Sequence, residues 1–205
     1  ANKFDSNNDN NISENKENTW NKFDTDILTN IIDQTKLIDL VNHQLNKSIK
    51  LERIYSSDTH AMKFDAFHSA CDNQGPTLTL IRNTFGNVFG GYTKLDIKVV
   101  DRSYKYFKDE TAFLFKVIPD IEIFPIKSDS IDKALYSQYH GFLIAFGGGN
   151  DLWIYDDGNK IDGYCDPSRY DIPNGTDLVG GKQIDINISK IDFKPTNIEV
   201  FKVIY

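Results

Sequence analysis

From Thr77 onward, the chain repeatedly alternates apolar and polar residues, which is the pattern of half-buried β-strands. TLTLIRN at 77–83 and VFGGYTKL at 88–95 flank a turn around Phe85, Gly86 and Asn87, and they predict a β-hairpin. The further predicted strands are AFLFKVI (112–118), IEIFPIK (121–127), KALYSQY (133–139), GFLIAF (141–146), DLWIYD (151–156), KQIDINI (182–188) and IEVFKVIY (198–205). So many short strands must be buried in packed sheets.

The segments before Thr77 are predicted to be mainly helical. Thr29 or Asn30 can cap a helix over 30–46. Its apolar face would consist of Ile31, Leu37, Ile38, Val41 and Leu45. IKLERIYSS at 49–57 alternates like a strand, and a short helix at 63–71 is stopped by DNQGP. Because helices come first and strands follow, the predicted class is α+β, with two antiparallel sheets in a sandwich flanked by helices.

Residues 1–19 are predicted to form a disordered, Asn-rich arm, and 20–205 a folded domain. Seven of the first nineteen residues are Asn, and only Phe4 and Ile12 are bulky and apolar. Such a segment buries too little surface to offset the entropy lost on ordering. Docking of the arm onto a partner is the alternative interpretation.

The composition argues against several classes of partner. With 30 acidic and 23 basic residues, the chain has a formal net charge of −7 and is a poor match for nucleic acid or an anionic membrane. It has no apolar run of the roughly 18–20 residues that a membrane-spanning helix needs. The start of the sequence lacks the pattern of a signal peptide. Only two cysteines are present, which favours a reducing, cytoplasmic location.

The glycine-rich segments predict turns and close packing rather than ligand binding. Gly147, Gly148 and Gly149 precede Asn150 and Asp151, but neither a Lys-Ser/Thr pair nor a helix follows, as a phosphate-binding loop would require. A tight turn is therefore the preferred interpretation. The pair Gly90-Gly91 indicates a bulge or a close approach of backbones within a strand.

No metal or catalytic motif is recognisable. The four histidines are His43, His60, His68 and His140, and none lies in an HExxH motif. His68 and Cys71 could share a helix face, but a single HxxC pair is weak support for a metal site. Cys71 is predicted to be a buried structural thiol, with a reactive, peroxide-sensing thiol as the alternative.

The acidic segment 156–178 lies within a Gly-, Asp- and Pro-rich stretch up to Gly181, which predicts an irregular surface loop. Its carboxylates do not follow the EF-hand spacing, so a solvated loop is preferred and weak Ca²⁺ binding is the alternative. Together with 96–109 and the arm before Trp20, this segment is the expected place for exposed partner contacts.

In combination, the motifs resemble the TLDc domain family. FHSACDNQGPTLTLI (67–81), VFGGYT (88–93), AFLF (112–115), FPIK (124–127), AFGGGNDLWI (145–154) and IEVFKV (198–203) occur in the order found in that family. The resemblance covers about 180 residues, and it departs from many relatives in the arm and in TKLDIKVVDRSYKYFKDE (93–110). It implies a sandwich of two antiparallel sheets flanked by helices.

The matching signature residues are expected to be mostly structural. They are Phe67, Cys71, Asp72, Asn73, Gly75, Pro76, Thr77, Phe89, Gly90, Gly91, Tyr92, Phe113, Phe115, Phe146, Gly147, Gly148, Gly149, Asp151, Glu199 and Phe201. Five aromatic residues are expected to fill the core between the sheets, namely Phe89, Tyr92, Phe113, Phe115 and Phe146. Asp72 and Asn73 are expected to hydrogen-bond turn backbone, and Pro76 to fix the exit from the helix.

The resemblance also implies a function. Members of the family are linked to oxidative-stress resistance, and several bind the vacuolar proton-pumping ATPase. The expected function is therefore that of a non-enzymatic regulator, without metal or cofactor, that binds the peripheral sector of this ATPase. Such a protein would be cytoplasmic and would reach acidic-organelle membranes only through its partner. The alternatives are a redox-protective protein with a reactive Cys71, and a structural module of another large assembly such as microtubules.

Overall fold

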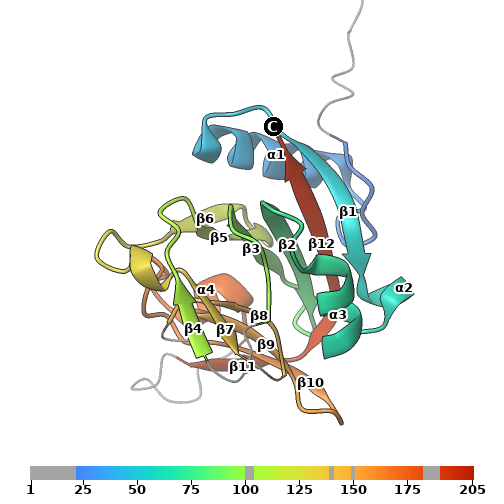
Figure 1. Cartoon of the computed structure of the whole chain (residues 1–205). Helices are drawn as coiled ribbons and strands as arrows, with labels where there is room; N and C mark the ends of the chain where they lie inside the picture. Colours follow the sequence, from blue (N-terminus) through green and yellow to red (C-terminus); the bar gives the residue numbers. More distant parts are fainter. Residues whose placement is uncertain (1–21, 100–103, 139–140, 149–150, 182–189) are drawn as a thin grey trace, which may run out of the picture.

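The computed structural model describes residues 22–99, 104–138, 141–148, 151–181 and 190–205, which form two antiparallel sheets packed face to face (Figure 1). Sheet I contains, in spatial order, β1 (Lys50–Ser56), β12 (Pro195–Ile204), β2 (Thr77–Asn83), β3 (Val88–Thr93), β5 (Phe113–Ile118) and β6 (Glu122–Pro125). Sheet II contains β11 (Ile191–Phe193), β10 (Ile161–Cys165), β9 (Leu152–Asp156), β8 (Phe142–Phe146), β7 (Leu135–Gln138) and β4 (Tyr104–Phe107). The predicted α+β sandwich is confirmed.

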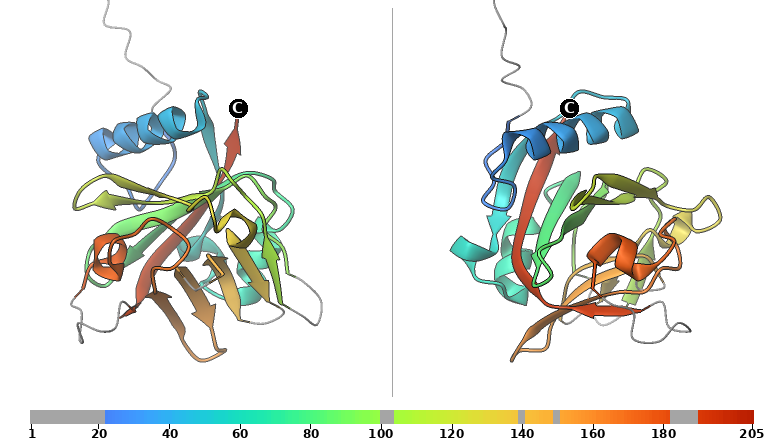
Figure 2. Two further views of the ribbon diagram at one scale, coloured as in Figure 1. Left: turned by 90° about the vertical axis from the view of Figure 1, so that its left-hand side faces the viewer. Right: turned by 180° about the vertical axis from the view of Figure 1, so that it is seen from behind.

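The helices lie around these sheets (Figure 2). They are α1 (Ile31–Leu45), α2 (Ser57–His60), α3 (Phe64–Cys71), the short 3₁₀ helix η2 (Ile131–Lys133) and α4 (Gly175–Val179). Among the described residues, no helix combines the length and the apolar character that crossing a bilayer requires. The predicted strand at 182–188 and the predicted arm at 1–19 lie outside the described residues.

Helix α1 begins and ends where its sequence indicates. The Asn30 side chain accepts a hydrogen bond from the Ile32 backbone N–H, and Asn46 ends the helix in a left-handed conformation with φ of 50°. Leu37, Ile38 and Val41 are buried as predicted. The prediction is wrong for Ile31, which is 50% exposed, because burial of the helix begins only at Gln34.

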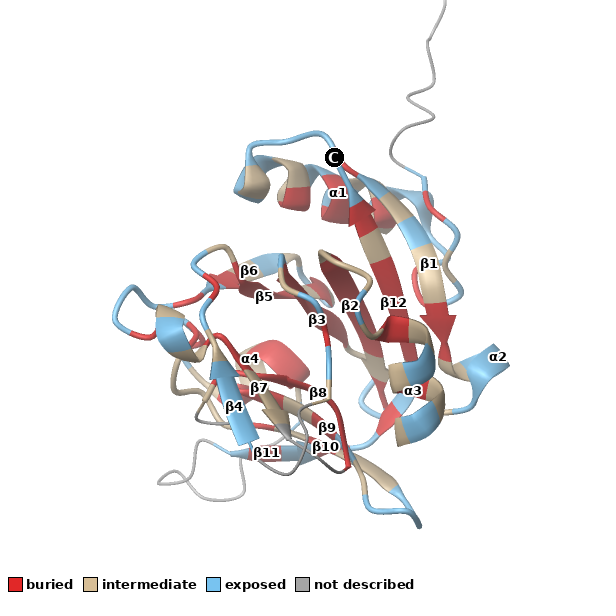
Figure 3. Ribbon diagram, viewed as in Figure 1, coloured by how far each residue is buried: buried red, intermediate tan, exposed pale blue. Residues whose placement is uncertain are grey.

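Sheet I is buried on both faces, and this creates two hydrophobic cores. One core lies between the sheets and contains Phe89 and Phe146, as predicted. Tyr92, Phe113 and Phe115 belong instead to the second core, which lies between sheet I and α1, so their predicted location is wrong. Alternation shows which residues of a strand share a face, but it does not show which element covers that face. Figure 3 shows buried residues running along β12 and β2.

The segment between 156 and 181 is not an irregular surface loop, contrary to the prediction. It contains β10 and α4, and Cys165 and Tyr170 are fully buried. A carboxylate from outside the segment orders its backbone, because Asp151 accepts hydrogen bonds from three successive N–H groups at 168–170. In the segment 96–109, which was predicted to be an exposed loop, the described residues form the mostly exposed strand β4, while Ile97 and Asp109 are buried.

The glycines of β3 allow the two sheets to approach each other. A Cβ atom on Gly91 would lie 2.6 Å from Cζ of Phe146 in sheet II and 2.8 Å from Cδ2 of Leu114. On Gly90, it would meet the backbone carbonyl of Thr79. The expected close approach of backbones is therefore present, and Gly91 marks the point where the Phe146 ring fills the gap between the sheets.

We expect Gly91→Ala to lower the free energy of unfolding by about 1–3 kcal/mol, because the added methyl group overpacks the core against Phe146. Urea denaturation followed by circular dichroism measures the change. In a double-mutant cycle, Phe146→Leu should be less destabilising in the Gly91→Ala background than in the wild type. Additive effects of the two substitutions would contradict this explanation.

Candidate protein-binding surface

Most of the signature residues lie in the interior of the domain. The buried ones are Phe67, Cys71, Thr77, Phe89, Gly90, Gly91, Tyr92, Phe113, Phe115, Phe146, Gly147, Asp151, Glu199 and Phe201. Asp72, Asn73, Gly75 and Pro76 form the turn after α3, while Gly148 is partly exposed and Gly149 lies outside the described residues. These positions stabilise turns and packing.

The turn after α3 connects the helix to the segment at 97–99. Asp72 Oδ1 lies 2.7 Å from His68 Nδ1, and Asp72 Oδ2 accepts a hydrogen bond from the Val99 N–H. Asn73 has a left-handed φ of 58°, and its N–H donates to the Ile97 carbonyl at 3.0 Å. Asp72 and Asn73 thus fix the backbone that follows β3.

The Cys71 thiol is enclosed in the core and is fully buried. Burial, reinforced by the charge of Asp72, raises the pKa of Cys71 far above its ordinary value. Both ring nitrogens of His68 are engaged, Nδ1 with Asp72 and Nε2 with the Phe142 carbonyl oxygen at 2.8 Å. His68 and Cys71 are therefore not arranged as metal ligands, and no group of metal-ligating side chains occurs among the described residues.

Gly147, Gly148 and Asp151, the described residues of the glycine-rich segment, make contacts within the domain. The N–H groups of Gly147 and Gly148 donate to the carbonyls of Ala134 and Lys133, so they do not point to an external anion. Gly147 has φ of 81°, and a Cβ there would lie 1.9 Å from Asp151 Oδ2. Burial raises the pKa of Asp151, although its hydrogen bonds from backbone N–H groups act in the opposite direction.

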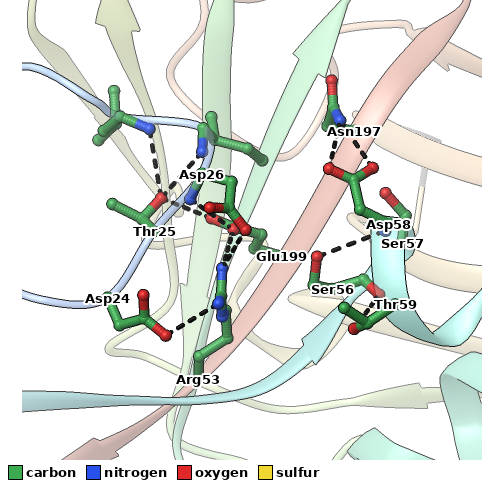
Figure 4. Close-up of polar contacts among 12 residues, drawn as sticks. Asp24, Thr25, Asp26, Arg53, Ser56, Ser57, Asp58, Thr59, Asn197 and Glu199 are labelled. Atoms are coloured by element: carbon green, nitrogen blue, oxygen red, sulfur yellow. Dashed lines mark hydrogen bonds and ion pairs between the residues drawn. The ribbon is translucent and has the colours of Figure 1, made fainter.

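Glu199 is the centre of a polar network that connects the N-terminal segment to β12 (Figure 4). Its carboxylate is 1% exposed and accepts hydrogen bonds from the Thr25 hydroxyl at 2.5 Å, the Asp26 N–H at 2.9 Å and Arg53 at 2.7 Å. Arg53 also pairs with Asp24 and Asp26 near the surface. Burial opposes the charge of Arg53, but its hydrogen bonds with Glu199 and Asp26 outweigh that effect and raise its pKa.

A continuous strip of aromatic side chains covers the outer face of sheet II. We call it the aromatic strip, and it consists of Tyr104, Tyr106, Tyr136, Phe142, Trp153, Tyr155 and Tyr164. In β9, Leu152 and Ile154 are buried in the core, so Trp153 and Tyr155 project outward. Neighbouring rings are in contact, with centroids 5.8 Å apart for Tyr136 and Trp153 and 4.7 Å apart for Trp153 and Tyr164.

The strip leads into a groove of about 820 Å³ between the β9–β10 hairpin, β11 and the turn that contains Phe85. Trp153, Tyr155 and Tyr164 line it, with charged side chains from Lys160, Asp162, Asp192 and Lys194. Phe85 is 48% exposed and Tyr155 37%. Exposed aromatic rings that bear polar edges are typical of protein-binding surfaces, since they bury a large area at low cost in side-chain entropy.

None of the signature residues lines this groove. A signal was present in the sequence, because DLWIYD has four successive large hydrophobic residues, Leu152 to Tyr155, in a strand that should expose one face. The alignment of Tyr106, Tyr136, Trp153 and Tyr164 across four strands depends on strand order, which alternation alone does not reveal.

Comparison with known proteins gives two findings. A family model described as the TLDc domain matches residues 9–204. A protein of Danio rerio, named MTOR-associated protein MEAK7, is 30% identical over 71 residues. That similarity covers 35% of this chain and 15% of the relative, so the chain matches only a small part of the length of that protein.

The Glu199 network predicts different effects for two of the three carboxylates that pair with Arg53, Glu199 and Asp24. Glu199→Ala should lower the free energy of unfolding by about 3–5 kcal/mol, because it leaves Arg53, the Thr25 hydroxyl and the Asp26 N–H without their buried acceptor. Asp24→Ala is the matched control, since Asp24 is 79% exposed, and it should cost less than about 1 kcal/mol. Urea denaturation measures both variants, and equal effects would rule out a special role for Glu199.

Both cysteine thiols should be unreactive in the folded protein, because Cys71 and Cys165 are buried and burial raises the pKa of each. Labelling with Ellman's reagent at pH 8 should be negligible in buffer and complete in guanidinium at about 6 M, because roughly this concentration unfolds even stable domains. Rapid labelling of native Cys71 would instead support the redox-protective alternative.

Proposed function

The chain belongs to the TLDc domain family, and from that premise we propose that it is a non-enzymatic protein-binding module that regulates a vacuolar proton-pumping ATPase. In this proposal it binds the peripheral sector of the ATPase and so contributes to oxidative-stress resistance. Its place of action is the cytoplasmic side of acidic organelles, which it reaches through the partner. The observation that supports protein binding is the groove at the end of the aromatic strip.

The groove has the properties expected of a partner site. Specific interfaces concentrate aromatic residues in their centre and surround them with polar groups. Trp153 and Tyr164 provide the aromatic centre here, and Lys160, Asp162 and Asp192 provide the charged rim. The rings are already in contact with one another, so few side chains would have to become ordered on binding.

Cys71 and His68, the nucleophile and the base that lie close together on α3, do not form a catalytic arrangement. Cys71 is buried with a raised pKa, and His68 is held between Asp72 and a backbone carbonyl. A nucleophile needs an accessible site and a neighbouring base that can remove its proton. These contacts argue against a redox-protective role for Cys71. They favour a binding role for the protein.

An affinity purification from lysate of the source organism, followed by mass spectrometry, tests the proposal. The wild-type protein should retain peripheral-sector ATPase subunits. Tyr155→Ala should retain at least about tenfold less, because truncation of an aromatic hot-spot residue typically costs about 2 kcal/mol or more of binding free energy.

Ile32→Ala is the matched control, since Ile32 is a 59% exposed apolar residue on α1, outside the groove. It should retain the same subunits as the wild type. Recovery of a different assembly without ATPase subunits would contradict the proposed partner. Microtubules are one such assembly, and an mTOR-containing complex is another, which the name of the relative MEAK7 suggests.

A further inference from the structure

We infer that the groove binds a basic, extended segment of the partner and holds its arginine or lysine side chains between aromatic faces and aspartate carboxylates. This inference rests on the proposed protein-binding role of the groove, but not on the identity of the partner as an ATPase. It specifies which chemistry the partner must present.

The strand register brings each groove carboxylate next to an aromatic ring. Asp192 on β11 is directly opposite Tyr164 on β10, and Tyr164 is opposite Trp153 on β9. One row across the strands therefore reads Trp153, Tyr164, Asp192. In the adjacent row, Asp162 on β10 is opposite Tyr155 on β9. Directly opposed side chains on one face of an antiparallel sheet are close enough to act on the same ligand group.

The chain's own lysines already pair with both groove aspartates, so a cation lies beside each of these carboxylates. The Lys190 ammonium lies 4.3 Å from the centroid of the Tyr164 ring and 3.3 Å from Asp192 Oδ1. The Lys160 ammonium lies 2.5 Å from Asp162 Oδ2. Both lysine side chains are largely solvated, with 43% and 65% exposed, so these pairs contribute little free energy and can be exchanged.

The charged lining of the groove is balanced, with Lys160 and Lys194 against Asp162 and Asp192, and the aromatic lining then favours a cation over an anion. The face of an aromatic ring carries partial negative charge, so it attracts cations and repels carboxylates. Tyr164 is also influenced by nearby acids, since burial and then the charges of Asp166 and Asp192 raise its pKa. The overall net charge of −7 adds long-range attraction for a basic segment.

Arginine fits these positions better than the resident lysines. A guanidinium group stacks on an aromatic face while it donates two parallel hydrogen bonds to a carboxylate, and it is more weakly hydrated than an ammonium group. The two rows are separated by two residues of β10, Asp162 to Tyr164, which is a distance of about 6.6 Å along a strand. Alternate side chains of an extended segment that runs along β10 have the same spacing, so Arg-x-Arg is the favoured sequence.

Titration with three fluorescent peptides tests the inference. They contain Arg-Ser-Arg, its neutral isostere citrulline-Ser-citrulline, or Glu-Ser-Glu. Fluorescence anisotropy with the full chain should show binding of the arginine peptide that weakens as salt is added. The citrulline peptide should bind at least about tenfold more weakly, since it retains shape and stacking but lacks the charge.

Four variants identify the site. Asp162→Asn combined with Asp192→Asn should lower the affinity for the arginine peptide about tenfold, and Tyr164→Leu about fivefold. Asp120→Asn in the exposed β5–β6 turn is the control for net charge and should have no effect. Lys190→Gln should increase the affinity a few-fold, because it vacates Tyr164 and Asp192. If the groove instead bound an acidic segment, Lys190→Gln would lower the affinity for the glutamate peptide.

Three outcomes would overturn the inference: tighter binding of the glutamate peptide, full binding by the double aspartate variant, or binding of none of the peptides. The proposed function fails separately, through the affinity purification. If Tyr155→Ala abolishes retention of ATPase subunits while the arginine peptide does not bind, the groove is the partner site but its basic ligand is wrong. If the arginine peptide binds and no ATPase subunit is retained, the ligand chemistry is correct and the partner is another protein.

Discussion

The buried Glu199 carboxylate is the interaction on which the second core depends. A charge that is almost fully removed from water is tolerated only when its oxygens are hydrogen-bonded, and here Thr25, Asp26 and Arg53 supply the donors. These contacts hold the segment at 23–28 against β12. Phe23, Ile27 and Leu28 then pack into the core beneath α1. One polar group thereby fixes where the entry segment lies, and the packing of α1 follows from it.

Much of this architecture could be predicted from sequence, and the exceptions share a physical cause. Caps, turns and period-two patterns are local, so they identified α1, the six strands of sheet I and three strands of sheet II, namely β7, β8 and β9. Tyr92 and Phe113 were assigned to the wrong core because the covering element is a tertiary property. The segment with β10 and α4 was misinterpreted because distant groups, notably the Asp151 carboxylate, satisfy its backbone.

The candidate site was less predictable than the scaffold. The family signature drew attention to positions such as Gly91 and Asp151, which solve packing and turn problems. The aromatic strip instead arises from one or two residues on each of several strands, and its members become neighbours only through strand order. In this sandwich, one set of residues stabilises the packing and the turns, and a different set forms the exposed aromatic face of sheet II.

The position of β12 affects how the domain can be synthesised. Although it is the last strand along the sequence, it lies between β1 and β2, which are the first two. Until residues 195–204 have left the ribosome, β1 has no partner in its sheet and β2 presents an open edge. A nascent chain must therefore keep these edges apart from other strands until β12 is available. The pairing of β12 with β1 and β2 is therefore a contact between distant parts of the sequence, which is the kind of contact that slows folding.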